Sequence, residues 1–383
     1  MKHASTTVAL VNGRVLLQDG FRDDVAVLLE GRTISAVLVA DDPRVATALQ
    51  RVDLHGGTLL PGFIDIQVNG GGGVLFNNDP TPDGLAVIAR SHRRFGTTGL
   101  LPTLISDTAE KMATAISATR AAIAQGVPGI LGLHLEGPYL NPARKGTHDD
   151  RVFRVPDARE IEVDTALDNG VTLITLAPER VPVETIRTLV ARGAIVFAGH
   201  TAASYEQALA GISAGITGFT HLYNAMSPLM GREPNVVGAA LEDRNTWCGV
   251  IVDGVHVHPS SLRVALAAKP RGKVLLVTDA MPMVGSDRPS FDLYGETITA
   301  VDGVVRNAAG SLAGSALDMA SAVRNTVDLL GLDLAEAARM ASTYPAQCIG
   351  LGDRLGVIAP GYQADLVLLD ADRQVVRSWI AGQ

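Results

Sequence analysis

Two histidines and one glutamate close short apolar segments whose composition favours β-strands. His200 follows Ala194–Gly199, His221 follows Gly218–Thr220, and Glu136 ends a third such run. A single histidine at a strand end is commonly a structural hydrogen-bonding residue. Two histidines on consecutive strands, with a carboxylate on a third, match a common catalytic zinc set that leaves one coordination position for water. Because the metal lowers the pKa of that water to near neutral, these residues predict a metal-dependent hydrolase.

Two further polar residues could move or direct protons beside such a metal. Asp279 ends the apolar run Val274–Thr278, where it could cap the following turn or act as a general base. As a base it would take the proton of the attacking water and pass it to a leaving amine. His148 follows the polar stretch Arg144–Thr147. It is either a solvated loop side chain or a donor to the carbonyl oxygen under attack.

Three other motifs give weaker signals. Asn69–Gly73 contains four consecutive glycines without a Gly-Lys-Ser/Thr ending, so a tight turn explains them without a phosphate site. Arg232 lies in a loop and is either solvated or an anion contact. His256 and His258 flank a valine and precede a proline. That context favours one substrate contact and one surface residue over a pair of metal ligands.

The segments that would position these residues alternate between apolar β-rich runs and amphipathic helical stretches, which predicts a parallel sheet. Eight strand–helix units in about 290 residues favour a (β/α)8 barrel of the TIM type over a doubly wound open sheet. In a barrel the carboxyl ends of all strands open on one face, so the polar residues there would converge. The predicted strands are Gly62–Gln67, Leu100–Leu104, Ile130–Glu136, Val171–Leu176, Ala194–Ala198, Gly218–His221, Cys248–Val252 and Val274–Thr278. Predicted helical stretches include Thr108–Gln125, Val183–Ala191, Ser204–Ala214 and Pro259–Ala268.

The two ends of the chain carry short alternating segments separated by turns, a pattern typical of antiparallel strands. We expect residues 1–55 and 354–383 to pair into one small β-sandwich domain, with residues 56–353 forming the barrel. The stretch 286–310 predicts hairpins about Asp302-Gly303, an excursion after the eighth barrel strand. The terminal segments are Val8–Val11, Arg14–Leu17, Asp24–Leu29, Ile34–Leu38, Leu355–Ile358 and Ala364–Leu369, and those of the excursion are Glu296–Ala300 and Val301–Arg306.

The net charge of −8 argues against a nucleic-acid or anionic-membrane surface, since both need clustered Lys and Arg. No apolar core of signal-peptide length occurs in residues 1–20, and no apolar run of about 18 residues predicts a membrane span. The chain contains only two cysteines. These features predict a reduced, cytoplasmic protein.

Taken together, these segments resemble the N-acetylglucosamine-6-phosphate deacetylase family of the amidohydrolase superfamily. The match runs in order along essentially the whole chain, and its barrel motifs are specific to that family. Its C-terminal motif, at residues 360–367, is shared more widely across the superfamily. The barrel motifs are Pro61-Gly62-Phe63-Ile64-Asp65, His134-Leu135-Glu136-Gly137-Pro138, Lys145-Gly146-Thr147-His148, Gly199-His200-Thr201, Thr220-His221-Leu222-Tyr223-Asn224-Ala225-Met226, Gly231-Arg232-Glu233-Pro234, Asp253-Gly254-Val255-His256 and Val277-Thr278-Asp279-Ala280.

The resemblance implies metal-dependent hydrolysis of N-acetyl-D-glucosamine 6-phosphate to D-glucosamine 6-phosphate and acetate, a step of amino-sugar recycling. It implies that Glu136, His200 and His221 hold the metal. Asp279 would be the catalytic acid and base, and His148 would orient the carbonyl. A homodimer is also implied, in which the loop with the arginine serves the neighbouring subunit's site. The substrate-binding residues would be Gln67, Asn69, Asn224, Ala225 through its backbone, Arg232 and His256.

One departure from the wider superfamily bears on the number of metals. Many amidohydrolases carry His-x-His on the first strand and bind a second metal there, whereas this chain has Gln67-Val68-Asn69. Amides are poorer ligands than imidazole, and the run Val171–Leu176 lacks a lysine that could be carboxylated. We therefore expect one divalent metal ion per subunit. Zn²⁺ is the first expectation, and Fe²⁺, Co²⁺, Mn²⁺ and Cd²⁺ also suit the ligands.

Two alternatives stay open at this point. One is another amidohydrolase that acts on a different N-acyl substrate, of the D-aminoacylase or dihydroorotase type. A requirement for phosphate on the substrate would favour the deacetylase over this alternative. The other is a catalytically silent barrel that serves as a binding protein, and the presence of Glu136, His200, His221 and Asp279 argues against it.

Overall fold

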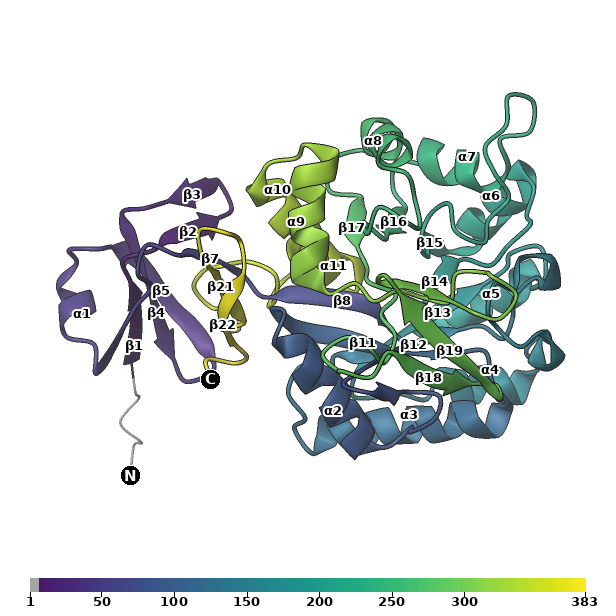
Figure 1. Ribbon diagram of the computed structural model, residues 1–383, viewed down its shortest axis with the longest axis horizontal. Coiled ribbons are helices and arrows are strands. Elements are labelled where there is room, and N and C mark those ends of the chain that lie inside the picture. Colours follow the sequence, from purple (N-terminus) through teal and green to yellow (C-terminus); the bar gives the residue numbers. More distant parts are fainter. Residues whose placement is uncertain (1–6) are drawn as a thin grey trace.

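The computed structural model describes residues 7–383. Its larger part is an eight-stranded parallel barrel surrounded by helices, and two smaller sheets from the chain ends lie beside it (Figure 1). The predicted (β/α)8 barrel with a small β-sandwich from both termini is therefore confirmed. The barrel strands are β8 (Phe63–Val68), β11 (Thr97–Ile105), β12 (Gly132–Glu136), β13 (Val171–Leu176), β14 (Ile195–Ala198), β15 (Ile216–Phe219), β16 (Trp247–Val250) and β17 (Val274–Leu276).

Backbone contacts between the first and last strands close the barrel. Val68 and Ala280 form a parallel bridge just beyond the end of β17. The Asn69 N–H donates to the Ala280 carbonyl at 2.9 Å, and the Asp279 N–H donates to the Gln67 carbonyl at 3.0 Å. An open doubly wound sheet would leave these two edges apart. Closure instead brings the carboxyl end of β8 beside Asp279.

The barrel strands are buried because both of their faces are covered. Every residue of β8 and of β11 is buried, as expected for parallel strands with a packed interior on one side and helices on the other. Close packing begins at Gly62, where a Cβ atom would lie only 2.1 Å from Thr98 Oγ1. Glycine at this position therefore lets the chain enter the barrel against β11.

The surrounding helices begin and end at residues suited to caps. In α6, Ser204 and Gln207 form a reciprocal capping box at the amino end, and Gly215 ends the helix with a φ of 116°. The four helical stretches named from the sequence are all present. The helices are α1 (Pro43–Ala46), α2 (Pro82–Arg93), α3 (Ala109–Ala124), α4 (Ala158–Asp164), α5 (Val183–Ala191), α6 (Tyr205–Ala214), α7 (Asn235–Glu242), α8 (Pro259–Ala268), α9 (Met319–Leu330), α10 (Leu334–Ala341) and α11 (Thr343–Cys348), with 3-10 turns at Pro142–Arg144 and Asp150–Val152.

Two sheets with strand orders β5-β4-β1-β6 and β22-β21-β7-β2-β3 form the smaller part. Apolar side chains such as Leu10, Leu59, Leu366 and Trp379 fill the space between them. The predicted segment Leu355–Ile358 is not a strand, because the backbone turns there at Gly356 with a φ of 82°. The strands are β1 (Thr7–Val11), β2 (Arg14–Leu17), β3 (Gly20–Arg22), β4 (Val25–Glu30), β5 (Thr33–Val39), β6 (Gln50–Asp53), β7 (Thr58–Pro61), β21 (Leu366–Leu369) and β22 (Val375–Trp379).

A three-stranded antiparallel sheet follows the last barrel strand, as the hairpin pattern predicted (Figure 1). It consists of β18 (Ser290–Leu293), β19 (Glu296–Val301) and β20 (Val304–Arg306), and we call it the flap. Phe291 and Leu293 of the flap pack in one apolar cluster with Ile105, the last residue of β11, and Met281, in the segment that follows β17. The flap therefore lies at the end of the barrel where polar residues were expected to converge. A two-stranded ribbon, β9 (Gly70–Gly71) with β10 (Val74–Leu75), adjoins it.

Within residues 7–383, none of the helices combines the length and apolar character that crossing a membrane requires.

Candidate active site

Three polar residues beyond the ends of barrel strands share an unusual backbone conformation. His200, His221 and Asp279 have φ values of 47°, 32° and 52°, in the left-handed region that residues other than glycine seldom adopt. They follow β14, β15 and β17, respectively, and each turns its side chain into the carboxyl end of the barrel. Strained residues of this kind persist where the surrounding structure holds them, and they concentrate at functional sites.

The side chains of Glu136, His200 and His221 meet at the centre of this end of the barrel. Glu136 Oε1 lies 3.2 Å from His200 Nε2 and 3.0 Å from His221 Nε2, and the two nitrogens are 3.0 Å apart. All three residues are buried. Ligand atoms of a tetrahedral zinc ion lie about 3.4 Å from one another at bond lengths of about 2.0–2.2 Å. One carboxylate and two imidazoles at these separations therefore fit a divalent cation.

The partner of the other ring nitrogen of His200 supports this fit. His200 Nδ1 lies 2.8 Å from the carbonyl oxygen of Arg144, and a carbonyl can only accept. Nδ1 therefore carries the proton, and the lone pair of Nε2 points towards Glu136 Oε1. A backbone carbonyl that fixes the tautomer in this way is the usual support of a histidine that binds metal.

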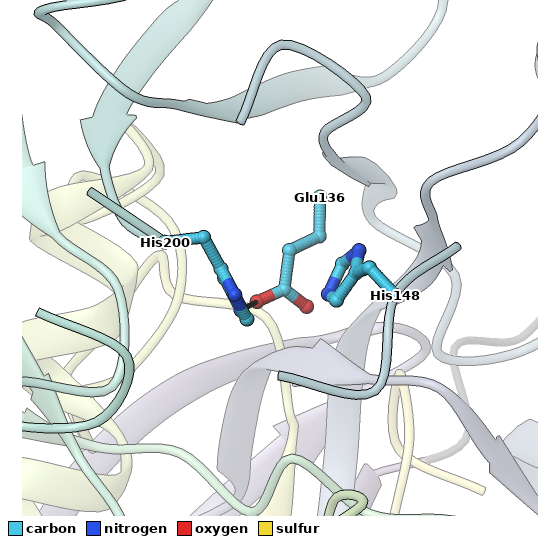
Figure 2. Close-up of side chains that lie close together, drawn as sticks. All are labelled: Glu136, His148 and His200. Atoms are coloured by element: carbon cyan, nitrogen blue, oxygen red, sulfur yellow. Dashed lines mark hydrogen bonds and ion pairs between the residues drawn. The ribbon is translucent and has the colours of Figure 1, made fainter. Parts of the chain in front are cut away.

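His148 enters the same cluster from the loop after β12. Metal-binding atoms of Glu136, His148 and His200 lie within 4.8 Å of one another, and Figure 2 shows the His148 ring beside the carboxylate. The chain thus offers two candidate sets of three ligands. Both contain Glu136 and His200, and the third member is either His148 or His221. The contacts of His221 with both other ligands at 3.0 Å favour the set with His221. The interpretation of His148 as a solvated side chain is wrong, because it is 4% exposed.

Burial shapes the charge states of these groups. It lowers the pKa of His148 well below the ordinary histidine value, so this imidazole is neutral. Burial opposes ionisation of Glu136, but the adjacent imidazoles of His200 and His221 hold the pKa of Glu136 well below its usual range. Burial, with the nearby charge of Glu136, raises the pKa of Asp279 to about 6. The two carboxyl groups thus differ in proton affinity, as the roles expected for them, metal ligand and proton carrier, require.

Two amide side chains on β8 and just beyond it link these carboxylates. Asn69 Nδ2 donates to Asp279 Oδ1 at 2.6 Å. Gln67 Nε2 lies 3.2 Å from both oxygens of Glu136 and 3.3 Å from Asp279 Oδ1. Both amides therefore present donors to the carboxylates. The sequence Gln-x-Asn in this arrangement orients Glu136 and Asp279.

A pocket of about 400 Å³ opens above these groups. Of the expected substrate contacts, Asn69, Asn224, Ala225 and His256 line it. Gln67 lies deeper and lines a separate small cavity in the barrel interior. Arg232 is exposed on the loop before α7. This loop projects from the barrel (Figure 1).

Three other polar residues near the ends of barrel strands serve neighbouring segments. Thr103 Oγ1 accepts from the Val68 N–H inside the barrel. Glu179 accepts hydrogen bonds from Thr201 Oγ1, the Ala202 N–H and Asn141 Nδ2, and so fixes the turn after His200. Asp253 Oδ2 lies 2.6 Å from His256 Nδ1, which orients that ring towards the pocket.

Sequence reasoning missed several residues of the site. Ser106, directly after β11, contacts His148. Ser311, Leu312 and Gly314 line the pocket from the segment that follows the flap. Ser106 follows a predicted strand within two residues, so its position was a usable signal. The segment after the flap offered none, because it contains no ionisable residue.

The sequence profile of the amidohydrolase family matches residues 58–383. The chain belongs to the amidohydrolase family. It is 48% identical over 351 residues to the N-acetylgalactosamine-6-phosphate deacetylase of Shewanella sp. strain ANA-3, covering 92% of this chain and 87% of that protein. It is 35% identical to the N-acetylglucosamine-6-phosphate deacetylase of Haemophilus influenzae, covering 98% of each chain.

A solved structure supports the assignment of the chain to this family. The crystal structure of N-acetylglucosamine-6-phosphate deacetylase from Pasteurella multocida superposes with a TM-score of 0.95 at 37% identity, covering 98% of each chain. The family resemblance inferred from the sequence motifs is therefore confirmed, and so is a hydrolase of the deacetylase type. The family and the cluster of one glutamate and histidines also indicate a divalent metal site.

Proposed function

We propose that this amidohydrolase removes the acetyl group of N-acetyl-D-glucosamine 6-phosphate, giving D-glucosamine 6-phosphate and acetate. The observation that carries the proposal is the convergence of the Glu136, His200 and His221 ligand atoms beside the half-buried carboxyl group of Asp279. The 400 Å³ pocket above them has the size of a small-ligand site. The names of the relatives supply the substrate class.

One divalent cation per chain, held by Glu136, His200 and His221, would supply a Lewis acid and a water ionised near neutral pH. Asp279 accepts the proton of the attacking water as the bond from oxygen to the acetyl carbon forms. It returns that proton to the nitrogen as the carbon–nitrogen bond breaks, so the amine leaves neutral. His148 donates to the carbonyl oxygen, where negative charge develops. Asn69 and Gln67 keep Asp279 and Glu136 in place through this cycle.

The phosphate would be bound by His256 and by Arg232 from a second subunit. Arg232 is remote from its own pocket on a projecting loop whose Leu229 and Met230 are 51% and 52% exposed. Apolar side chains exposed in this way favour burial against another chain. We therefore propose a homodimer in which each loop completes the neighbouring site. Asn224 and the backbone at Ala225, which line the pocket, would bind the sugar.

A second candidate substrate is N-acetyl-D-galactosamine 6-phosphate, which differs in the configuration at one ring carbon. The 48% identity to a deacetylase named for this sugar, against 35% for one named for the glucosamine compound, favours it specifically. Both substrates place the same acetamido and phosphate groups in the pocket. The mechanism is therefore the same for either.

The test measures acetate release from four compounds: both N-acetylhexosamine 6-phosphates and their unphosphorylated parents. Turnover of the phosphorylated sugars alone, lost on chelation and restored by Zn²⁺, would support the proposal. The ratio of kcat/KM for the two phosphorylated sugars would decide between them. Equal activity with and without phosphate would contradict the role of Arg232 and His256. Inactivity of the metal-loaded protein on all four would favour a D-aminoacylase or dihydroorotase type of substrate.

The domain limits and the cellular location are also proposals. Residues 1–55 with 354–383 would form the small β domain, and residues 56–353 the barrel. β7 would then lie at the junction, because it pairs with β21 and leads through Gly62 into β8. We propose a cytoplasmic enzyme, in which the buried thiols of Cys248 and Cys348 stay reduced.

A further inference from the structure

His148 is held at Nδ1 by a group that can only donate. The backbone N–H of Ser106 points at His148 Nδ1 at 3.3 Å, and the Ser106 hydroxyl lies 2.8 Å from the same atom. A nitrogen that accepts from a backbone N–H cannot carry a proton itself. In the neutral ring the proton therefore resides on Nε2. The hydroxyl lies 2.8 Å from Nδ1 and 3.4 Å from the Glu136 carbonyl oxygen, so its one proton is directed chiefly at Nδ1.

The peptide that provides this N–H is fixed on both sides. Asn77 Nδ2 donates to the Ile105 carbonyl at 2.9 Å, and Asn77 Oδ1 accepts from the Ile105 N–H at 3.1 Å. On the other side, the hydroxyl of Tyr294 donates to the Ser106 carbonyl at 2.5 Å. Neither partner belongs to the ligand set. Their common effect is to hold Ser106 still.

Tyr294 makes this contact from an unusual position. It lies in the two-residue turn between β18 and β19, where Tyr294 and Gly295 have φ values of 53° and 83°. Turns of this kind favour Asn or Gly at the first position, because a side chain of tyrosine size is strained at positive φ. In this strained conformation Tyr294 lies at the tip of the flap, and its hydroxyl contacts the Ser106 carbonyl. A strained residue with a specific contact is an observation that points to function.

We infer that Ser106, anchored by Tyr294 of the flap, is a positioning residue that holds His148 as the Nε2–H tautomer. The catalytic consequence rests on the proposed function, in which His148 donates to the substrate carbonyl. With the proton on Nε2, His148 presents a donor to the pocket. With the proton on Nδ1, it would present a lone pair, which would repel the developing oxyanion and compete for the metal. The contact between Ser106 and His148 Nδ1 thus makes Nε2–H a hydrogen-bond donor to the substrate and prevents His148 from binding the metal.

The direct test reads the tautomer by NMR in the Zn²⁺-loaded enzyme labelled with ¹⁵N-histidine. The His148 signals are assigned by their loss in His148→Gln. Long-range proton–nitrogen correlations distinguish a protonated from an unprotonated ring nitrogen. An unprotonated Nδ1 with a protonated Nε2 is expected. A protonated Nδ1 would overturn the inference, whatever the activity of the enzyme.

Variants then test the two anchors. Ser106→Ala removes one of the two donors to Nδ1, and we expect the His148 signals to move towards a tautomer mixture and kcat to fall about tenfold with KM nearly unchanged. Tyr294→Phe should produce the same changes to a smaller extent. Tyr362→Phe is the matched control, because that hydroxyl also donates to a backbone carbonyl, of Gly352 at 3.1 Å, but far from the site.

Unchanged His148 signals in both Ser106→Ala and Tyr294→Phe would overturn the positioning role. Should Ser106→Ala fail to fold, Tyr294→Phe and the wild-type tautomer still decide the matter. A shifted tautomer with unaltered turnover would have a different meaning. It would support the control of His148 by Ser106 while contradicting the donor role of His148 in the proposed function.

Discussion

The imidazole rings of His148 and His200 lie with their centroids 4.4 Å apart, and the backbone holds their Nδ1 atoms with partners of opposite kind. His200 Nδ1 faces a carbonyl, whereas His148 Nδ1 faces an N–H. The two rings therefore present a lone pair and a donor, respectively, to the same space. This difference suits His200 to the proposed role of metal ligand and His148 to the proposed role of hydrogen-bond donor, although both histidines are buried beside Glu136.

The ligand assignment predicts which variants lose metal. Glu136→Gln, His200→Gln and His221→Gln should each bind Zn²⁺ at least tenfold more weakly, because each removes one of three protein ligands. His148→Gln should retain one equivalent per chain. Metal content after dialysis, measured by mass spectrometry beside the folded state from circular dichroism, checks this. Metal loss in His148→Gln together with retention in His221→Gln would instead identify His148 as the ligand.

Replacement of Asp279 should separate chemistry from metal binding. Asp279→Asn keeps an acceptor near Asn69 but cannot carry a proton, so kcat should fall by about 10²–10⁴-fold while one Zn²⁺ stays bound. Single-substrate kinetics and metal analysis on the same preparation measure both effects. Turnover within a few-fold of wild type would rule out Asp279 as the proton carrier.

The fold could be predicted from the sequence because two independent patterns indicated a barrel. These were the periodicity of apolar residues and the polar residues at the ends of the predicted strands. All eight predicted barrel strands are present. Polar residues that follow several of these strands line one pocket at the carboxyl end of the barrel. The segment Leu355–Ile358 was mistaken for a strand because three of its four residues are branched apolar residues. Ile358 is indeed buried in the small β core, but the turn at Gly356 prevents pairing.

Only those site residues whose side chains have a recognisable chemistry could be predicted from the sequence. Glu136, His200, His221 and Asp279 are ionisable residues at strand ends, so their convergence followed from barrel topology. Ser106 and Tyr294 act through a backbone N–H and a hydroxyl at the tip of a hairpin, and neither group has a sequence signature. The opposite tautomers of His148 and His200 depend on which backbone atom faces each ring, and no pattern of side chains encodes that.

Arg232 provides a test of the proposed dimer by complementation. Arg232→Ala should lose phosphate binding in every site of its own homodimer, and Asp279→Asn should lose catalysis. In a mixed dimer, the intact site of the Arg232→Ala chain would receive Arg232 from the Asp279→Asn chain. We therefore expect activity to reappear when the two inactive proteins are co-expressed, at up to about a quarter to a half of the wild-type level.

The control for this experiment mixes Arg232→Ala with a chain that carries both substitutions, which cannot donate an arginine. Light scattering of each protein establishes the oligomeric state. Absence of recovery in co-purified mixed dimers would show that Arg232 does not serve the partner's site. Activity of the Arg232→Ala homodimer on the phosphorylated sugar equal to that of wild type would show that this arginine does not bind phosphate.

Stability should depend on pH through Asp164, which ends α4 at 2% exposure and accepts a hydrogen bond from the Tyr139 hydroxyl. Burial raises the pKa of Asp164 to about 7. Between its ordinary pKa of about 4 and this value, the folded protein keeps a proton that the unfolded chain has lost. The free energy of unfolding therefore falls as the pH rises through this window, since the unfolded state binds fewer protons. Asp164→Asn cannot ionise and should lack this contribution.

Urea unfolding at pH 5 and pH 8 measures the effect as a difference between wild type and Asp164→Asn. We expect the difference to change by about 2–3 kcal/mol between these pH values, in the direction that makes the variant relatively more stable at pH 8. The other titrating groups cancel in this comparison. Asp353→Asn, at an exposed position, should track wild type at both pH values. A difference between wild type and Asp164→Asn that stays constant with pH would mean that Asp164 is ionised in the folded protein throughout, with the Tyr139 hydroxyl sufficient to stabilise its charge.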